Sequence, residues 1–113
     1  MQFSSFKEFY PYYLSQHQNG MCRLCHLIGS SGVLALLAYA IITAQYMLLL
    51  GLPVVGYGFA WIGHFGFEKN KPATFGYFNY SLWSDWVMMK DILTGTIPLL
   101  GPLPEEHFSS VKQ

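Results

Sequence analysis

The chain has 113 residues, a length that fits a single domain spanning residues 1–113. Hydrophobic residues make up 52% of it and charged residues only 11%, well below the roughly 25% charge of a typical soluble domain. Six basic and six acidic residues give a formal net charge of zero, which argues against a nucleic-acid partner, because nucleic-acid-binding proteins present a basic face. The composition therefore predicts a small protein built for lipid or for a very apolar interface.

The N-terminal segment, residues 5–18, has the pattern of a short helix at a membrane surface. Ser5, followed three residues later by Glu8, forms a capping box that starts the helix, and Pro11 bends or restarts it. The segment is dense in Phe and Tyr, whose amphipathic rings favour the headgroup region of a bilayer. An ordinary packed helix is the alternative. Because the segment lacks the apolar region of a secretory signal, we expect no signal peptide.

Asn19-Gly20 predicts a turn that decides how His17 and His26 are related. On an unbroken helix, their separation of nine residues would place them about 13.5 Å apart on opposite faces, too far to share a metal. With a chain reversal between them, the two imidazoles converge. The turn is therefore a condition of any site that uses both.

Cys22-Arg23-Leu24-Cys25-His26 matches the C-x-x-C-H pattern of c-type haem attachment. Covalent haem of this type requires export, for which the chain shows no signal, and the pentapeptide leads directly into apolar sequence. A zinc site built from Cys22, Cys25, His17 and His26 is a second alternative. With two cysteines and no sign of export, we favour reduced thiols packed as small apolar groups.

Two apolar runs predict a pair of membrane-spanning helices. Residues 33–50 would rise about 27 Å as a helix, close to the roughly 30 Å hydrocarbon thickness of a bilayer. Gly51-Leu52-Pro53 is expected to form the turn, and residues 52–67 the second span, in which Gly56 and Gly58 let a neighbouring helix approach closely. The predicted fold class is an all-α membrane protein, a transmembrane helical hairpin flanked by interfacial helices.

The orientation of this hairpin follows from its basic residues. Lys7 and Arg23 precede it, the other four lysines follow it, and its predicted turn has none. Both ends of the hairpin are therefore expected on the cytoplasmic side of a multi-pass integral membrane protein. The same geometry brings His26, just before the first span, to the membrane face where the second span ends at His64.

The second apolar run leads into a polar cluster around His64. If residues 63–71 begin as a helix, His64 and Glu68 lie on one face, and the carboxylate can orient the imidazole by accepting its second N–H proton. The alternative is that Glu68, Lys69 and Lys71 form the solvated collar where an apolar helix leaves the membrane.

A last helix is predicted over residues 81–94, with Asn79 or Ser81 as its cap and Gly95 as its stop. Its tryptophans are typical of interfacial anchors. Asp85 lies among apolar neighbours on this helix, where an ionised carboxylate is costly unless it is paired or bound. Asp85 is therefore a site candidate, with pairing to a lysine as the alternative.

His17, His26 and His64 are thus expected at one membrane interface. Three imidazoles with an open coordination position suit zinc or iron, and a ferrous ion held in this way binds dioxygen. For any single histidine, packing or hydrogen bonding is the more ordinary explanation. The metal hypothesis depends on the convergence of all three.

The motifs around these residues are similar to those of one known family. Gly63-His64-Phe65, together with residues 68–75, is the most specific of them. The others, in chain order, are Tyr12-Tyr13-Leu14, His17-x8-His26, Ser81-Leu82-x-x-Asp85-x-x-Met88 and Leu93-Thr94-Gly95. They cover about residues 8–96 and resemble the 2-hydroxypalmitate dioxygenase-like family of small membrane proteins.

This resemblance implies an iron(II)-dependent dioxygenase that performs α-oxidation of 2-hydroxy fatty acids, shortening the chain by one carbon with dioxygen as co-substrate. It implies a setting in membrane lipid, in a bacterial inner membrane or the endoplasmic reticulum. The implied Fe(2+) ligands are His17, His26 and His64. Three further residues match motif positions and are the catalytic candidates: Glu68, Asn70 and Asp85.

One position departs from the family pattern. Members usually carry an asparagine five residues after the first histidine, where this chain has Cys22. The departure affects which side chains hold His17 and His26 in place, and it leaves a different substrate as an alternative. Two alternatives of other classes are a non-enzymatic membrane scaffold or interaction protein with the same fold, which would tolerate alanine at all three histidines, and a haem protein, which would show a Soret band.

Overall fold

The computed structural model describes residues 3–72 and 76–108, and every regular element in these ranges is helical. The predicted all-α fold class is confirmed. Residues 73–75 of the predicted family motif lie outside the described residues. The α-helices are α1 (Phe6–Ser15), α2 (Gly20–Ile42), α3 (Leu52–Trp61) and α4 (Phe78–Leu93). Shorter elements are the 3-10 helices η1 (Tyr46–Gly51) and η4 (Glu105–His107) and the π-helix η2 (Ile62–Glu68).

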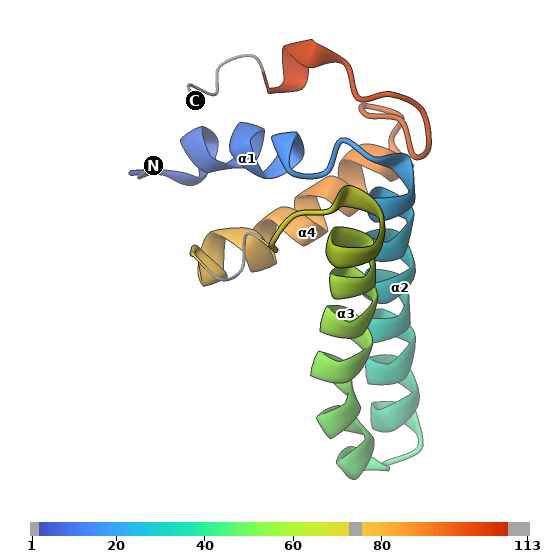
Figure 1. Cartoon of the computed structure of the whole chain (residues 1–113). Coiled ribbons are helices and arrows are strands. Elements are labelled where there is room, and N and C mark those ends of the chain that lie inside the picture. Colours follow the sequence, from blue (N-terminus) through green and yellow to red (C-terminus); the bar gives the residue numbers. More distant parts are fainter. Residues whose placement is uncertain (1–2, 73–75, 109–113) are drawn as a thin grey trace.

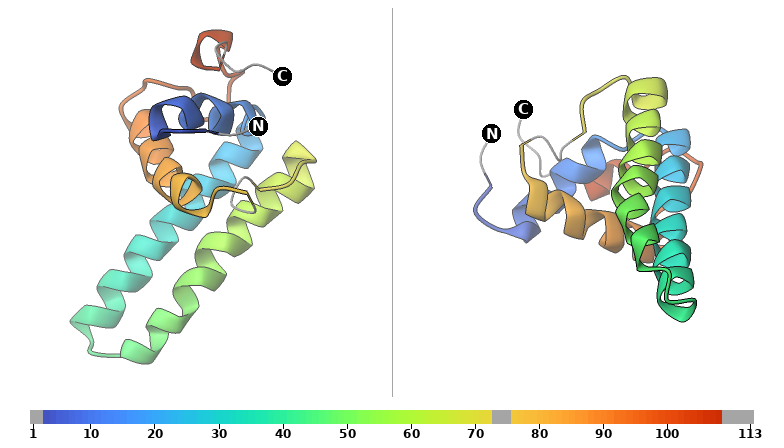
Figure 2. Two further views of the ribbon diagram at one scale, coloured as in Figure 1. Left: turned by 90° about the vertical axis from the view of Figure 1, so that its left-hand side faces the viewer. Right: turned by 90° about the horizontal axis from the view of Figure 1, so that it is seen from below.

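Two long antiparallel helical arms dominate the molecule (Figures 1 and 2). One arm is α2, and the other is the succession of η1, α3 and η2; we call them together the helical pair. Each arm is 23 residues long, Gly20–Ile42 and Tyr46–Glu68, and each is long and apolar enough to cross a membrane. The pair extends away from the rest of the chain in Figure 1 and in the left view of Figure 2.

The chain reversal of the helical pair lies at residues 43–45, where Ala44 adopts a left-handed backbone with φ of 56°. The predicted first span, 33–50, and the predicted turn at Gly51-Leu52-Pro53 are therefore wrong, whereas the second predicted run, 52–67, lies within the second arm. The first helix begins earlier because the Asn19 side chain accepts from the Met21 N–H at 2.8 Å and caps it at Gly20. Pro53 does not interrupt the second arm, because it occupies the first turn of α3, where no N–H is needed.

Glycines of α2 set the close approach of the two arms. A Cβ on Gly29 would lie 3.0 Å from the Phe59 Cβ and 3.3 Å from the Gly56 carbonyl oxygen, so only a glycine fits there without displacing backbone. A Cβ on Gly56 would lie 3.3 Å from a Val33 methyl, as its predicted packing role requires, whereas Gly58 faces open space. The close contact therefore depends on α2 as much as on the predicted glycines of the second arm.

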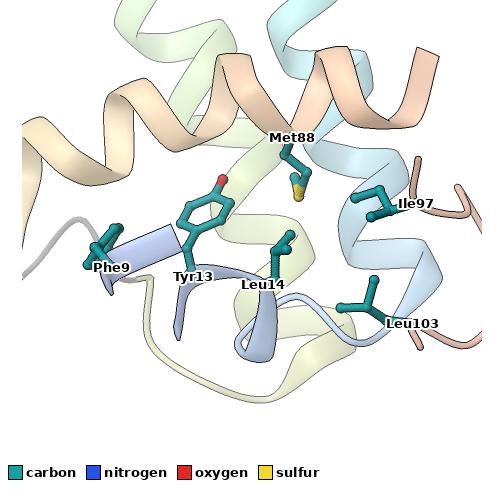
Figure 3. Packing of buried hydrophobic residues seen from close by; sticks show 6 residues of the cluster. All are labelled: Phe9, Tyr13, Leu14, Met88, Ile97 and Leu103. Carbon is teal, nitrogen blue, oxygen red and sulfur yellow. The ribbon is translucent and has the colours of Figure 1, made fainter. Parts of the chain in front are cut away.

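The remaining helices cross one end of the helical pair, where α2 begins and η2 ends (Figure 1). We call α1, α4 and the segment 94–108 the cap. Its apolar core joins all three parts through six buried side chains (Figure 3). They are Phe9, Tyr13 and Leu14 from α1, Met88 from α4, and Ile97 and Leu103 from the C-terminal segment. Helices α1 and α4 match the helices predicted over residues 5–18 and 81–94 to within three residues.

The helix ends of the cap follow the sequence signals only in part. Ser5 Oγ accepts from the Glu8 N–H at 3.3 Å as predicted, but the Glu8 carboxylate accepts from Ser4 instead of returning to Ser5. Helix α4 starts after Tyr77 without a side-chain cap, so the predicted caps at Asn79 and Ser81 are wrong. Gly95 ends α4 with φ of +79°, as the predicted stop requires.

Candidate metal centre

Three histidines from three separate segments meet where the cap joins the helical pair. His17 follows α1, His26 lies in the second turn of α2, and His64 lies in η2. Their Nε2 atoms are close together, 3.0 Å between His17 and His26 and 3.1 Å between His26 and His64. All three side chains are buried. The predicted convergence of the three imidazoles is what the structure shows.

Local backbone features bring the histidines together. The reversal capped by Asn19 turns the chain between His17 and His26, as the turn signal predicted. On the opposite arm, a Cβ on Gly63 would lie 3.1 Å from the Cys22 carbonyl oxygen, so this glycine lets η2 approach α2 beside the site. The π-helical winding of η2 then directs His64 inward; single π-turns of this kind are frequent at functional sites.

Each histidine uses its other ring nitrogen to hold an oxygen acceptor. The Nδ1 atoms lie 2.6 Å from the Tyr13 carbonyl for His17, 3.0 Å from Asp85 Oδ1 for His26, and 2.7 Å from Asn70 Oδ1 for His64. A carbonyl and a carboxylate oxygen can only accept, so Nδ1 is the protonated nitrogen.

The Asn70 amide follows the same logic. Its nitrogen donates to the backbone and side-chain oxygens of Gln16 at 3.0 and 3.1 Å, which leaves its oxygen for His64. All three Nε2 lone pairs are therefore free and face one another.

Facing lone pairs at this separation fit a shared cation better than a hydrogen bond. With every ring proton on Nδ1, no proton is left between the Nε2 atoms to join them. Imidazole nitrogens about 2.0–2.1 Å from a metal would be roughly 2.8–3.0 Å apart at a right angle and roughly 3.3–3.4 Å apart at the tetrahedral angle. The observed separations of 3.0 and 3.1 Å lie at the upper end of the first range and between the two. The residues present thus fit a divalent transition metal.

The electrostatics of the site favour neutral ligands. Burial, reinforced by the neighbouring His26 and His64, holds the pKa of His17 well below its usual value. His17 is therefore uncharged at neutral pH, the form that binds metal. Burial and the charge of Asp85 raise the pKa of Tyr13 well above its usual value, so its hydroxyl stays protonated and donates to Asp85.

Asp85 and Asn70 are two of the predicted catalytic candidates. They orient His26 and His64 through Nδ1, the ring nitrogen that faces away from the other histidines. Asp85 accepts from both His26 and the Tyr13 hydroxyl, so the alternative of a lysine partner is wrong. Such carboxylate–histidine pairs fix the tautomer and increase the basicity of a metal ligand. Asn70 reaches His64 because Lys69 adopts a left-handed conformation, φ 64°, which folds the chain back at the end of η2.

Glu68 lies in a different place from the one predicted. Its carboxylate accepts from the backbone N–H groups of Gln18 and Asn19, at 3.0 and 2.6 Å, and not from His64. The expected alignment of His64 and Glu68 assumed an α-helix, whereas the winding of η2 is that of a π-helix and changes the register. Glu68 therefore fixes the loop that carries His17. Lys69 and Lys71 are exposed, and the alternative of a solvated collar stays a prediction.

Tyr13 and Arg23 are part of the site although neither was predicted to be. Tyr13 offers its carbonyl to His17, stacks its ring on that imidazole at a centroid distance of 4.0 Å, and directs its hydroxyl toward α4 (Figure 3). Its position four residues before His17 was the available signal. Arg23 is fully buried and donates to the carbonyls of His17, Gln18, Pro98 and Gly101. It ties the His17 loop to the C-terminal segment.

Cys22 lies at the edge of the centre. Its sulfur is 3.9 Å from His64 Nδ1, and one ligand atom from each of His17, Cys22, His26 and His64 lies within 4.8 Å of the others. Both cysteines are buried free thiols, as expected. Among the described residues Cys25 is not part of this group, so a zinc site that uses both cysteines does not match the structure.

Comparison with known proteins gives one match. The family model described as 2-hydroxy-palmitic acid dioxygenase Mpo1-like matches residues 3–97, a range that contains all three histidines and their oxygen partners. Neither a curated protein nor a solved structure matches the chain significantly. The match covers most of the 113 residues and confirms the resemblance in the sequence motifs. The chain belongs to the Mpo1-like family.

Proposed function

We propose that the chain is an iron(II)-dependent dioxygenase that shortens 2-hydroxy fatty acids by one carbon. The observation that carries the proposal is the convergence of three Nε2 lone pairs, each made available by an oxygen acceptor at Nδ1. The name of the family supports the reaction and the substrate class. The Nε2 separations support a shared transition metal, and the choice of iron rests on the name of the family.

The metal ligands in this proposal are His17, His26 and His64. When bound, a ferrous ion with open positions supplies a site for dioxygen and for the chelating hydroxyl and carboxylate of a 2-hydroxy acid. The overall change is balanced if the substrate carboxyl carbon leaves as carbon dioxide, the shortened acid carries the second substrate carbon as its carboxyl group, and the remaining oxygen becomes water.

The other site residues act through these ligands. Asp85 and Asn70 hold the Nδ1 protons of His26 and His64, so we assign them as positioning residues instead of catalytic ones. Glu68 is also a positioning residue. It does not contact a histidine ring and acts by fixing the backbone of the loop that carries His17. Burial of the three imidazoles excludes bulk water from the side of the centre that faces the cap.

We propose further that the helical pair is a transmembrane hairpin. Only 22% and 11% of the most apolar windows of the two arms are buried within the protein, whereas the core helix of a soluble protein would be mostly buried. Large apolar side chains such as Ile42, Met47 and Leu50 are 71–82% exposed. Helices α1 and α4 then lie at the membrane interface, and the metal centre lies where they meet the hairpin.

The lysines support a cytoplasmic location for both ends of this hairpin. Lys7 precedes the pair, Lys69 and Lys71 follow it, and the turn at residues 43–45 carries no basic residue. Arg23 was counted among these basic residues from the sequence, but it is buried against carbonyls and does not contribute to the orientation.

Metal analysis tests the proposal. Protein purified anaerobically in mild detergent should hold about one iron per chain, which His17→Ala, His26→Ala and His64→Ala should each remove. His107→Ala is the matched control, because His107 pairs with Glu106 in the C-terminal segment, away from the centre. Wild type should convert 2-hydroxypalmitate to the acid one carbon shorter, with consumption of dioxygen. Absence of iron after ferrous reconstitution, with function retained in all three variants, would favour a membrane scaffold.

A further inference from the structure

A cavity of about 210 Å³ adjoins the metal centre between α2, α3 and α4. Its wall includes His26 and Asp85, which belong to the centre, and then apolar side chains from all three helices. The same residues that orient one metal ligand therefore form one end of an apolar space.

The cavity is elongated along the helical pair. His26, Ser30 and Val33 line it from α2 and lie on one face of that helix, over an axial rise of about 10 Å. Gly56 lines it from α3, where a side chain would come within 3.3 Å of Val33 and narrow the space. From α4, Leu82 is part of the wall. The space leads from the histidines toward the turn of the helical pair.

We propose that this cavity binds the head-group-proximal part of the acyl chain of the 2-hydroxy acid. The inference rests on the proposed function, which places the hydroxyl and carboxylate at the histidines. An amphiphile with its polar end at His26 and Asp85 matches the order of polar and apolar residues along the wall. Its volume is below the roughly 300–1,000 Å³ of pockets that enclose whole drug-sized ligands, so the distal part of a long chain extends beyond it.

In this arrangement, binding depends on the structure of the first carbons of the acyl chain and depends little on the total length of that chain. A methylene that moves from lipid into the cavity gains little transfer free energy, because both surroundings are apolar, so the selectivity of the cavity comes from the shape of its wall. Methylenes beyond the cavity lie against the exposed apolar side chains of the hairpin and the surrounding lipid, where they change affinity little. Leu82 is the residue best placed to limit the space, since its side chain is at once part of the wall and half exposed.

Photo-crosslinking under argon tests the inference without turnover. Iron-loaded protein in nanodiscs is irradiated with two forms of 2-hydroxypalmitate, one with a diazirine close to the head group and one with it at the chain terminus. The proximal probe should label peptides containing Val33, Gly56 or Leu82, and the terminal probe should label lipid or the outer faces of the helices. A phospholipid with a diazirine in its acyl chain is the competing occupant, and equal cavity labelling by it would overturn the proposal.

Leu82→Trp should lower proximal labelling about fivefold or more, because the larger indole overpacks the space that the acyl chain would occupy. Leu93→Trp, on the same helix but exposed and away from the cavity, is the matched control. Val33→Phe, paired with the exposed Leu34→Phe, repeats the test from α2, and iron content shows that each variant keeps its centre. Unchanged labelling in both cavity variants would refute the inference.

The two proposals fail separately. Turnover of 2-hydroxypalmitate with labelling outside the cavity would refute the cavity and leave the activity. Cavity labelling without turnover would refute the activity and leave a binding site for the 2-hydroxy acid.

Discussion

The end of the molecule that carries the histidines and the far end of the helical pair differ in what holds them together. Where the cap meets the helical pair, each of the three imidazoles has an oxygen acceptor, and the buried Arg23 donates to four carbonyls. Along the helical pair, glycines and apolar side chains pack closely inside while large apolar residues remain exposed outside. Substitutions should therefore be costly at the cap wherever they break a pair, and costly in the helical pair only where they change volume inside it.

The largest expected effect is that of Arg23→Met, which removes the donor to four carbonyls at once. Hydrogen bonds to a charged group contribute about 1.5–3 kcal/mol each, so the free energy of unfolding should fall by about 3 kcal/mol or more. Denaturation in detergent, followed by circular dichroism, measures it. Lys7→Met on the exposed face of α1 is the control, and an equal effect of the two substitutions would contradict a special role for the buried cation.

The next effect is expected at Asp85. Asp85→Ala removes the acceptor of His26 Nδ1–H and should weaken iron binding about 10–100-fold, as loss of such an outer partner does in metalloproteins. Titration of the metal-free protein with ferrous iron gives the affinity. Asp91→Ala is the matched control on the same helix, because the Asp91 carboxylate accepts from the Tyr10 hydroxyl and lies outside the centre. Iron affinity unchanged by Asp85→Ala would remove Asp85 from the site.

Gly29→Leu should disrupt the close packing between the two arms of the helical pair. Its side chain meets the Phe59 Cβ and the Gly56 carbonyl, and overpacking of this kind costs about 1–3 kcal/mol. Gly58→Leu places the same side chain where nothing lies within 4 Å, so it isolates the effect of the contact from that of losing a glycine. The free energy of unfolding in detergent distinguishes them; equal losses would show that the two arms do not pack as described.

The smallest effect is predicted for the exposed surface of the helical pair. Met47→Leu, at a side chain 78% exposed near the turn, should change the free energy of unfolding by no more than about 0.5 kcal/mol. Iron content should stay at the wild-type value. A clear loss of either would mean that this surface contacts a partner instead of lipid.

The convergence of the three histidines could be predicted from the sequence because each depends on a local signal. His17 and His26 needed only the turn at Asn19-Gly20, and His64 needed only an apolar run that returns to the same side. The partner of His64 could not be found in this way. A π-helix and a left-handed Lys69 put Asn70 where α-helical spacing had put Glu68, and neither feature has a distinct signature in a single sequence.

The position of the turn was missed for a related reason. Periodicity does not locate a reversal inside a nearly uniform apolar stretch, and Gly51-Leu52-Pro53 offered a stronger turn signal than the true one at residues 43–45. The burial of Arg23 could not be predicted from the sequence either. Two of its acceptors, Pro98 and Gly101, lie more than seventy positions along the chain and are backbone atoms without a side-chain signal.

The pairing of His26 with Asp85 also has a consequence for the order in which the protein is made. These residues are 59 positions apart, and α4, which carries Asp85, is the last long helix to be synthesised. A growing chain that has completed the helical pair already contains all three histidines but lacks the carboxylate that sets the tautomer of the central one. An iron ion bound as proposed would therefore be held tightly only after α4 has docked, and unfinished chains would carry little of it into contact with oxygen.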